Sequence, residues 1–470
     1  MTDLRIISVD DHVVEAPNAW TSRLPAKYKD VCLRYVIDDG EPTWQFEDVR
    51  IVPFRGNYNG AVWPLTERRP VWEPPRYEDL LPAAKDPVAR LAAMDRDGIE
   101  AAVLFPNLVR FCGQLFSEAA DKELGWLSIQ AYNDWIFDEW AAIAPERFIP
   151  AAMIPLWDPK LAAAELERMA ARGAKCFTFS EGPHQLGLPS IHDPGRFWDP
   201  VLSTANDAGL VVCTHLGSSS STPITAPDAP QGVGIALFQL AGQETCLDWL
   251  HSGHFDRFPN LQLCLSECGV GWVPAVLGLA EWSRNMAVER SPQPGQQHNE
   301  PALDDEQGQV FAAMTEAASE QARAGRSPRE VFHDHIYVCL IEEVHGVQFF
   351  EEIGLDNILI ETDYPHMATR WPNSIDYARR ATPGMSETDR ARIFNGNARR
   401  LFGIGSEGEA QKKKWLAARP APAPDMPRLS PLAAAAAAAG LTEDELMERM
   451  SKFGAGMRQR KRVEVSVASD

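Results

Sequence analysis

The sequence lacks long hydrophobic runs and any excess of basic residues. No apolar run approaches the roughly 20 residues that a helix needs to cross a bilayer. The start, Met1-Thr2-Asp3-Leu4-Arg5, lacks the basic and then apolar pattern of a signal peptide. The formal net charge is −21, whereas binding to nucleic-acid phosphates needs basic patches. We therefore expect a cytoplasmic protein with neither a membrane nor a nucleic-acid partner.

The eight cysteines form no recognisable disulfide framework. They are scattered along the chain, and Cys176, Cys213, Cys264 and Cys339 fall inside predicted strands. This distribution favours reduced, buried thiols. Cys264 and Cys268 stand four residues apart, but no second pair accompanies them, so a zinc knuckle is not expected.

A glycine-rich phosphate loop after the first predicted strand is also missing, which argues against a nucleotide-binding fold. What is present is an alternation of strands and helices. Helical patterns at 86–97 and 160–172 end at Gly98 and Gly173, as helices commonly do. The predicted strands are residues 4–9, 101–105, 148–154, 176–179, 210–214, 261–266, 336–341 and 358–362. Repeated strand–helix units predict a parallel sheet, and eight of them favour a closed (β/α)8 TIM barrel.

Three stretches fall outside this repeat. Residues 31–75 mix aromatic and charged residues with Pro and Gly, which predicts a small β insertion or long loop after the first strand. Residues 291–326 are polar and acidic, which predicts an exposed helical loop within a barrel domain at 1–403. Residues 404–470 form a C-terminal tail, in which Thr442 to Glu445 predict a capping box and a short helix. We expect the tail to pack on a neighbouring subunit or stay mobile, and the chain to form a homo-oligomer.

Acids and histidines collect at the C-terminal ends of the predicted strands, the face that carries the active site in β/α barrels. Asp10 and His12 follow the first strand, His215 the fifth and Asp363 the eighth. Residues two apart on extended backbone face the same way, so Asp10 and His12 can reach one ion. A single histidine at a strand end is more often a buried residue bonded to backbone. Four such groups on one face instead predict a mixed nitrogen and oxygen site for Zn(II), Mn(II) or Fe(II).

Two further groups at this face are candidates for proton transfer. Glu267 ends the sixth strand, and His366 follows Asp363 by three residues. Together with Asp363 they are the predicted catalytic residues. The alternatives are a fifth metal ligand for Glu267 and orientation of Asp363 for His366.

Substrate contacts have the weakest basis in the sequence. Arg370 and Trp371 follow the eighth strand, and an arginine beside an aromatic ring suits an aromatic carboxylate. The competing interpretation is a solvated face with a buried tryptophan. Glu15 is expected to be a salt-bridge partner, and His333 and His335 to be structural. Further candidates for the mouth of the site are His184, His192, His345, Arg55, Trp63, Arg68, Arg69 and Trp72.

Five segments resemble the amidohydrolase superfamily. They are residues 9–15 (VDDHVVE), 214–217 (THLG), 255–271 (FDRFPNLQLCLSECGVG), 361–366 (ETDYPH) and 397–403 (NARRLFG). They are most similar to the amidohydrolase-related branch, which includes aminocarboxymuconate-semialdehyde decarboxylase and γ-resorcylate decarboxylase. The resemblance covers residues 4–403 and leaves out the insertion and the tail.

The resemblance implies one divalent metal ion, zinc first with manganese or iron as alternatives, bound by Asp10, His12, His215 and Asp363. Many members have a histidine where Asp10 stands, and the carboxylate shifts the preference toward harder ions such as Mn(II). Glu267 stands where the decarboxylases have a histidine, and the carboxylate could act there as a general base.

The resemblance also implies an activity on a small molecule. We expect cleavage of a C–C bond, by decarboxylation or hydrolysis, in a small carboxylated compound that is aromatic or ring-derived. The first alternative is hydrolysis of an amide, ester or lactone by a metal-activated water. The second is a barrel that binds a partner without catalysis.

Overall fold

The computed structural model describes residues 4–51, 76–289, 325–340, 343, 345–422, 436–437 and 440–447. Contacts divide the chain into two units, residues 1–277 with 328–423 and residues 278–327 with 424–470. Most of the polar loop predicted at 291–326 and most of the tail lie outside the described residues. In the second unit the predicted capping box is present. The backbone N–H of Glu445 donates to Thr442 Oγ1 (3.2 Å), and that of Thr442 donates to Glu445 Oε2 (2.8 Å).

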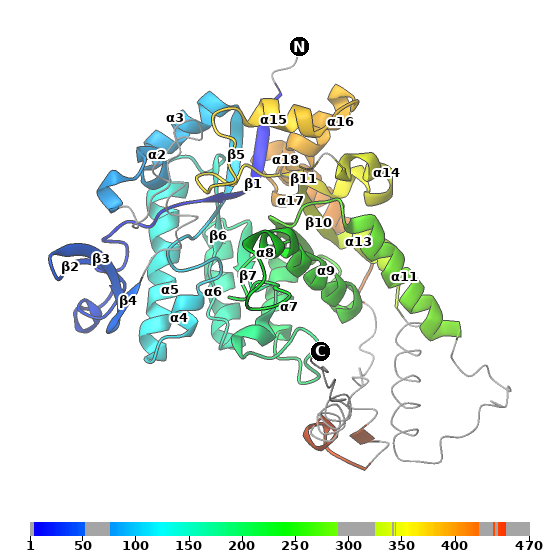
Figure 1. The fold of residues 1–470 in the computed structure, drawn as a ribbon, viewed down its shortest axis with the longest axis horizontal. Helices are drawn as coiled ribbons and strands as arrows, with labels where there is room; N and C mark the ends of the chain where they lie inside the picture. The colour runs from blue at the N-terminus through cyan, green and yellow to red at the C-terminus, as the bar shows by residue number, and fades with distance from the viewer. Residues whose placement is uncertain are drawn as a thin grey trace, which may run out of the picture. The chain divides into compact units, whose positions relative to one another are not determined.

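The first unit is built on a closed barrel of eight parallel strands, in the order β1–β5–β6–β7–β8–β9–β10–β11. Figure 1 shows helices surrounding these strands, which confirms the predicted (β/α)8 barrel. The strands are β1 Ile6–His12, β5 Ile99–Phe105, β6 Phe148–Ala152, β7 Cys176–Phe179, β8 Val211–His215, β9 Gln262–Ser266, β10 Ile336–Leu340 and β11 Ile358–Ile360. The longer helices are α3 Pro87–Asp97, α5 Lys122–Ile136, α6 Pro159–Ala171, α7 Asp199–Ala208, α9 Leu240–Ser252, α11 Val273–Glu289, α13 Pro328–His335, α15 Ser374–Ala381 and α18 Gly405–Ala417.

The helices begin and end where local chemistry requires it. At α3 the side chain of Asp86 accepts the N–H of Ala89 (2.7 Å), Pro87 takes the first helical position, and Gly98 ends the helix at φ 73°. At α6 the side chain of Asp158 accepts two backbone N–H groups in the same way. Each predicted helix therefore starts at its aspartate, one residue before a proline.

The barrel interior is apolar and closed at the end away from the site. Alternate residues of the strands, among them Ile7 and Leu359, form one buried cluster with Leu401 and Phe402 of α17 (Asn397–Phe402). The amide of Asn397 donates to the carbonyl of Ile358, the first residue of β11 (2.8 Å). The segment NARRLFG thus seals the N-terminal ends of the strands.

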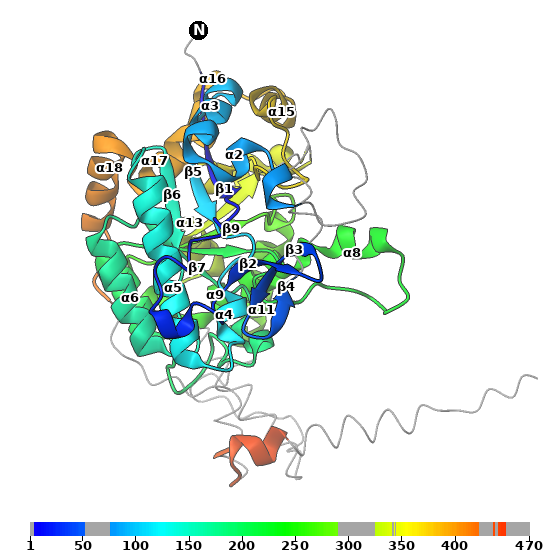
Figure 2. The ribbon, with the colours of Figure 1, turned by 90° about the vertical axis from the view of Figure 1, so that its left-hand side faces the viewer.

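The insertion after β1 is a small antiparallel sheet in its described part. Its strands are β2 Arg34–Asp38, β3 Glu41–Phe46 and β4 Val49–Ile51. Figure 1 shows it at the left, apart from the barrel strands, and in Figure 2 it faces the viewer. Phe46 packs edge-on against Phe116 (5.5 Å between ring centroids). The predicted insertion is therefore a β structure up to residue 51. Residues Arg55, Trp63, Arg68, Arg69 and Trp72 lie outside the described part.

Two predictions from composition can be compared with this fold. No helix among the described residues is long and apolar enough to cross a membrane. All eight cysteines are buried and free, as predicted. The cytoplasmic location and the homo-oligomeric state stay predictions.

Candidate metal centre

The end of β1 turns two side chains toward the site. The register between β1 and β5 shifts between Ser8 and Asp11, and beyond this irregularity Asp10 and His12 face the same point. His12 Nε2 lies 3.3 Å from Asp10 Oδ1. Asp11 points elsewhere, and its Oδ1 accepts hydrogen bonds from Ser8 Oγ (2.9 Å) and Thr362 Oγ1 (2.6 Å). The neighbouring acids Asp10 and Asp11 thus have separate environments.

A buried arginine holds the end of β1 in place through contacts with His12 and Asp11. Arg90 of α3 is 1% exposed, and its Nη2 donates to the carbonyl of His12 (2.6 Å). Its Nη1 lies 3.6 Å from Asp11 Oδ2, and its guanidinium lies 4.4 Å from the ring centroid of Tyr364. Burial raises the pKa of Asp11, while the charge of Arg90 opposes that rise.

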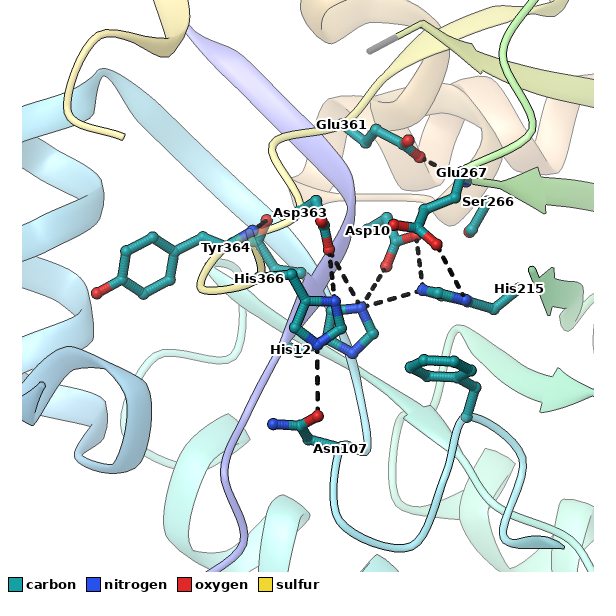
Figure 3. Close-up of polar contacts among 12 residues, drawn as sticks. Asp10, His12, Asn107, His215, Ser266, Glu267, Glu361, Asp363, Tyr364 and His366 are labelled. Atoms are coloured by element: carbon teal, nitrogen blue, oxygen red, sulfur yellow. Dashed lines mark hydrogen bonds and ion pairs between the residues drawn. The ribbon is translucent and has the colours of Figure 1, made fainter. Parts of the chain in front are cut away.

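The four predicted metal ligands lie close together, with His12 in contact with the other three (Figure 3). His215 Nε2 lies 3.1 Å from His12 Nε2 and 3.2 Å from Asp10 Oδ2. Asp363 Oδ1 lies 3.5 Å from His12 Nε2. None of the four side chains is more than 1% exposed. Strand ends far apart in the sequence therefore converge as predicted.

The hydrogen bonds of the two histidines determine which nitrogen faces the cluster. His12 Nδ1 lies 3.2 Å from the carbonyl of Pro106, and His215 Nδ1 lies 2.7 Å from that of Leu216. A carbonyl can only accept, so each Nδ1 carries the proton and each Nε2 presents a lone pair. Both carboxylate oxygens of the Asp10 side chain are buried, and neither accepts a hydrogen bond within the described part of the chain. Lone pairs this close repel one another unless a cation lies between them, so these residues fit one divalent ion.

Burial gives the same groups the protonation states that a metal ligand needs. It lowers the pKa of His12 and His215 well below the ordinary value, which keeps both rings neutral. It raises the pKa of Asp10, and the negative charges of Glu361 and Glu267 raise it further. A bound cation would reverse this rise for Asp10.

Glu267 stands beside the cluster. His215 pairs in register with Ser266, the residue before Glu267, and Glu267 Oε2 lies 3.7 Å from His215 Nδ1. Its backbone has a φ of 58°, a strained value for a residue with a side chain, and its N–H donates to Glu361 Oε2 (3.0 Å). Burial raises the pKa of Glu267, and the charge of Asp363 adds to this.

The spacing of the possible ligand atoms defines two overlapping groups that share His12. Within the described residues, two groups of side chains are close enough to hold an ion. They are Asp10 with His12 and His215, and His12 with Asp363 and His366. Glu267 belongs to neither group, and Asp363 is not in the group of Asp10 and His215. The choice for Glu267 between general acid–base catalysis and a fifth ligand therefore stays a prediction.

His366 is joined to the cluster through Asp363. Its Nδ1 lies 2.9 Å from Asp363 Oδ1, and its ring stacks on His12 with 3.6 Å between centroids. Its Nε2 lies 3.4 Å from Asn107 Oδ1. Burial lowers the pKa of His366 to about 3, so the neutral ring is suited to orienting Asp363.

The structure does not bring Arg370 and Trp371 to this cluster. The indole of Trp371 donates to the carbonyl of Ala93 in α3 (3.1 Å). Arg370 lies 5.3 Å from the ring centroid of Tyr377 in α15 and lines a small cavity with Ile6. Ile6 alternates along β1 with interior residues, so this is the outer side of the barrel. These contacts favour the structural interpretation of both residues.

The remaining candidates are either bonded to the backbone or exposed. Glu15 forms no salt bridge within the described part of the chain, contrary to the prediction, and its oxygens accept the backbone N–H groups of Asn107 (2.9 Å) and Leu108 (2.9 Å). His335 Nδ1 bonds to the carbonyl of Leu261 (2.8 Å), which agrees with a structural role. The exposed candidates are His184, His192, His333 and His345, of which His192 pairs with Asp248.

Sequence reasoning missed four residues around the cluster. Asn107 and Glu361 follow the ends of β5 and β11. The expectation that polar residues at the C-terminal strand ends line the site could therefore have identified them. Phe111 stacks on His215 with 3.9 Å between ring centroids, but it comes six residues after β5 and carries no signal in the sequence. Glu181 comes two residues after the end of β7.

A parallel barrel with two carboxylates and two imidazoles at its C-terminal strand ends defines a metal-dependent enzyme of the amidohydrolase type. The chain belongs to the amidohydrolase family, whose model matches residues 48–404. The predicted resemblance to this superfamily is thereby confirmed, with four of the five segments inside the matched range.

Three relatives illustrate the relationship. A γ-resorcylate decarboxylase of Polaromonas sp. (strain JS666 / ATCC BAA-500) is 25% identical over 328 residues, which cover 67% of this chain and 86% of the relative. The crystal structure of an amidohydrolase from Mycobacterium avium subsp. paratuberculosis K-10 has a TM-score of 0.63 and 23% identity, and covers 87% of this chain and 100% of its own. A dihydroxybenzoic acid decarboxylase from Polaromonas sp. JS666, solved with manganese and the inhibitor 2-nitroresorcinol, has a TM-score of 0.52 and 19% identity, and covers 86% of this chain and 99% of its own.

Proposed function

We propose that this protein is a metal-dependent decarboxylase of a small aromatic acid. The observation that carries the proposal is the convergence of two imidazole lone pairs and two carboxylates in one buried point. The γ-resorcylate decarboxylase relative supports an aromatic carboxylate as substrate. When bound, the divalent ion supplies charge stabilisation for the substrate carboxylate and its neighbouring oxygen.

Glu267 is the proposed proton donor. In the reaction a proton is added to the ring carbon that bears the carboxylate. The bond from that carbon to the carboxyl carbon then breaks, its electron pair returns to the ring, and CO2 leaves. Glu267 lies beside His215, and 14% of its side chain is exposed, so it can exchange its proton with solvent after each turnover.

The charges of the site agree with a neutral Glu267. Asp10, Asp363 and Glu267 would give −3 against the +2 of the ion, whereas a protonated Glu267 gives a neutral sum. Glu361 holds the backbone N–H of Glu267, and His366 holds Asp363. These two residues position the catalytic groups without contacting the substrate.

Manganese is the proposed ion. Two carboxylates among four ligands favour a harder ion than zinc, and a structurally similar decarboxylase was solved with manganese. Nothing in the contacts of this site favours zinc, which the sequence placed first.

Product analysis tests the proposal against hydrolysis by a metal-activated water. The manganese-loaded enzyme is incubated with a panel of hydroxybenzoates, beginning with γ-resorcylate, in water enriched in 18O. Decarboxylation gives equal amounts of CO2 and a phenol without 18O in the ring product. Incorporation of 18O into an organic product would establish hydrolysis instead. A protein that binds metal but turns over no substrate would favour the binding barrel.

A further inference from the structure

Within the described residues, a buried glutamate outside the metal cluster forms hydrogen bonds with only one of its two carboxylate oxygens. Glu181 comes two residues after β7 and is 7% exposed. Its Oε1 accepts three hydrogen bonds, from Gly217 N–H (2.8 Å), Ser219 N–H (3.3 Å) and Ser219 Oγ (2.8 Å). Its own N–H donates to Ser218 Oγ (2.8 Å). Both the backbone and one oxygen of Glu181 are therefore held in place.

The second oxygen of Glu181 is buried and has no hydrogen-bond partner among the described residues. Glu181 also forms no ion pair with a cation of the described ranges. A buried carboxylate oxygen without a donor is costly, because it has given up water without a replacement. The hydrogen bonds that hold the loop after β8 use only Oε1. They do not explain why Oε2 is buried without a hydrogen-bond donor.

The surroundings of Glu181 connect it to the catalytic face. The loop that it braces begins two residues after His215, and a side chain on Gly217 would stand 3.2 Å from the ring of Phe111, which stacks on His215. Phe179 of β7 pairs with Thr214 of β8, and His215 of β8 pairs with Ser266 of β9, so Glu181 and Glu267 follow the ends of strands that flank β8. Glu181 and Glu267 therefore share one low-dielectric region at the ends of β7, β8 and β9.

We propose that Glu181 Oε2 accepts a hydrogen bond from a ring hydroxyl of the substrate, and so selects hydroxylated aromatic acids. This assignment rests on the proposed function. A hydroxyl supplies the missing donor without adding charge, whereas a second carboxylate would be repelled by Glu181 and Glu267. Burial raises the pKa of Glu181 to about 7, so its acceptor form is populated above neutral pH. A site built around a substrate hydroxyl rejects analogues that lack it, because its own polar group is then left unpaired.

Two ligands that differ by one hydroxyl separate this role from bracing. The manganese-loaded full-length protein is titrated at pH 8.5 with 2-nitroresorcinol and with 2-nitrophenol, and binding is measured by calorimetry. We expect the wild type to bind 2-nitroresorcinol at least about ten-fold more tightly, since a hydrogen bond to a charged group contributes roughly 1.5–3 kcal/mol. Glu181→Gln retains an oxygen for the three donors on Oε1 but places an NH2 group at Oε2.

The expected result for Glu181→Gln is a preference reduced to about three-fold or less, with unchanged manganese content and unchanged affinity for 2-nitrophenol. Glu118→Gln is the matched control, because Glu118 bonds to Arg110 in the same corner but is 57% exposed, and it should keep the wild-type preference. If Glu181→Gln keeps the full preference, or if the wild type has none, the assignment is overturned while the proposed function stands. If neither nitrophenol binds to the loaded wild type, the assignment falls together with the proposed function.

Discussion

The Nε2 atoms of His12 and His215 face each other across 3.1 Å, while the Nδ1 atom of each ring is bonded to a backbone carbonyl. Two lone pairs at this distance are incompatible with a hydrogen bond between the rings, because neither Nε2 has a proton to give. The pair is compatible with a cation that both nitrogens bind. This relationship, more than any motif, defines the centre as a metal site.

Replacement of one of these rings should remove the metal. We expect His215→Ala to lower the equivalents of manganese bound per chain by at least about ten-fold, because removing even a group that only orients a ligand costs that much affinity. Plasma mass spectrometry after dialysis against a fixed manganese concentration measures the effect. The control is His333→Ala, an exposed histidine of α13, which should bind as the wild type does. Equal metal content in His215→Ala and the wild type would refute the ligand assignment.

Glu267→Gln should separate catalysis from metal binding. Loss of the proton donor is expected to lower kcat on the order of 10²–10⁴-fold, the usual contribution of a positioned acid or base, with manganese content unchanged. Steady-state kinetics and metal analysis of the same preparation check both parts. Loss of the metal would instead make Glu267 a ligand, and near-normal turnover would exclude it as the proton donor.

Arg90 should matter for stability far more than its neighbours on α3. Arg90→Ala leaves the buried Asp11 without its cation and the carbonyl of His12 without its donor. We expect a loss on the order of 3–5 kcal/mol in the free energy of unfolding, measured with denaturant. Arg96→Ala on the same helix removes an exposed guanidinium that lies 5.2 Å from the ring centroid of Trp371, and should cost less than about 1 kcal/mol. Similar losses for both variants would contradict this account.

Glu15 should make the stability depend on pH. Burial raises the pKa of Glu15 to about 7 in the folded protein, from 4.5 as the ordinary value. Between pH 4.5 and pH 7 Glu15 is protonated in the folded protein but ionised in the unfolded chain. The stabilisation that this proton gives the folded protein is therefore fully present below pH 4.5 and is lost as the pH rises through 7. The loss is on the order of 3 kcal/mol.

Glu15→Gln should flatten this dependence. The test is the difference in free energy of unfolding between pH 5 and pH 8, compared for the variant and the wild type. The difference should be smaller in the variant by about the amount that Glu15 contributes. An identical pH dependence in both proteins would show that Glu15 does not bind a proton in that range.

The fold and the convergence of Asp10, His12, His215 and Asp363 could be predicted because both follow from rules that act locally. Each strand is a short apolar run, and Asp86, Asp158, Gly98 and Gly173 mark the helix ends. The architecture then brings strand ends together whatever their distance in the sequence, which is why Asp10 and Asp363 were placed correctly.

The surrounding residues could not be predicted because their roles depend on side-chain direction. Trp371 follows a strand end as His366 does, but its indole turns outward to Ala93. Glu15 pairs with no cation among the described residues, and the loop after β5 supplies two backbone N–H groups instead. The Oε1 atom of Glu181 is held by the loop after β8, whose Gly217 lies 36 residues further along the chain.

Elemental analysis of the purified protein tests the central claim most directly. After reconstitution with manganese and removal of excess ion, plasma mass spectrometry should find about one equivalent per chain, bound by Asp10, His12, His215 and Asp363. Absence of manganese, zinc and iron both before and after reconstitution would contradict the metal centre and the decarboxylation proposed from it.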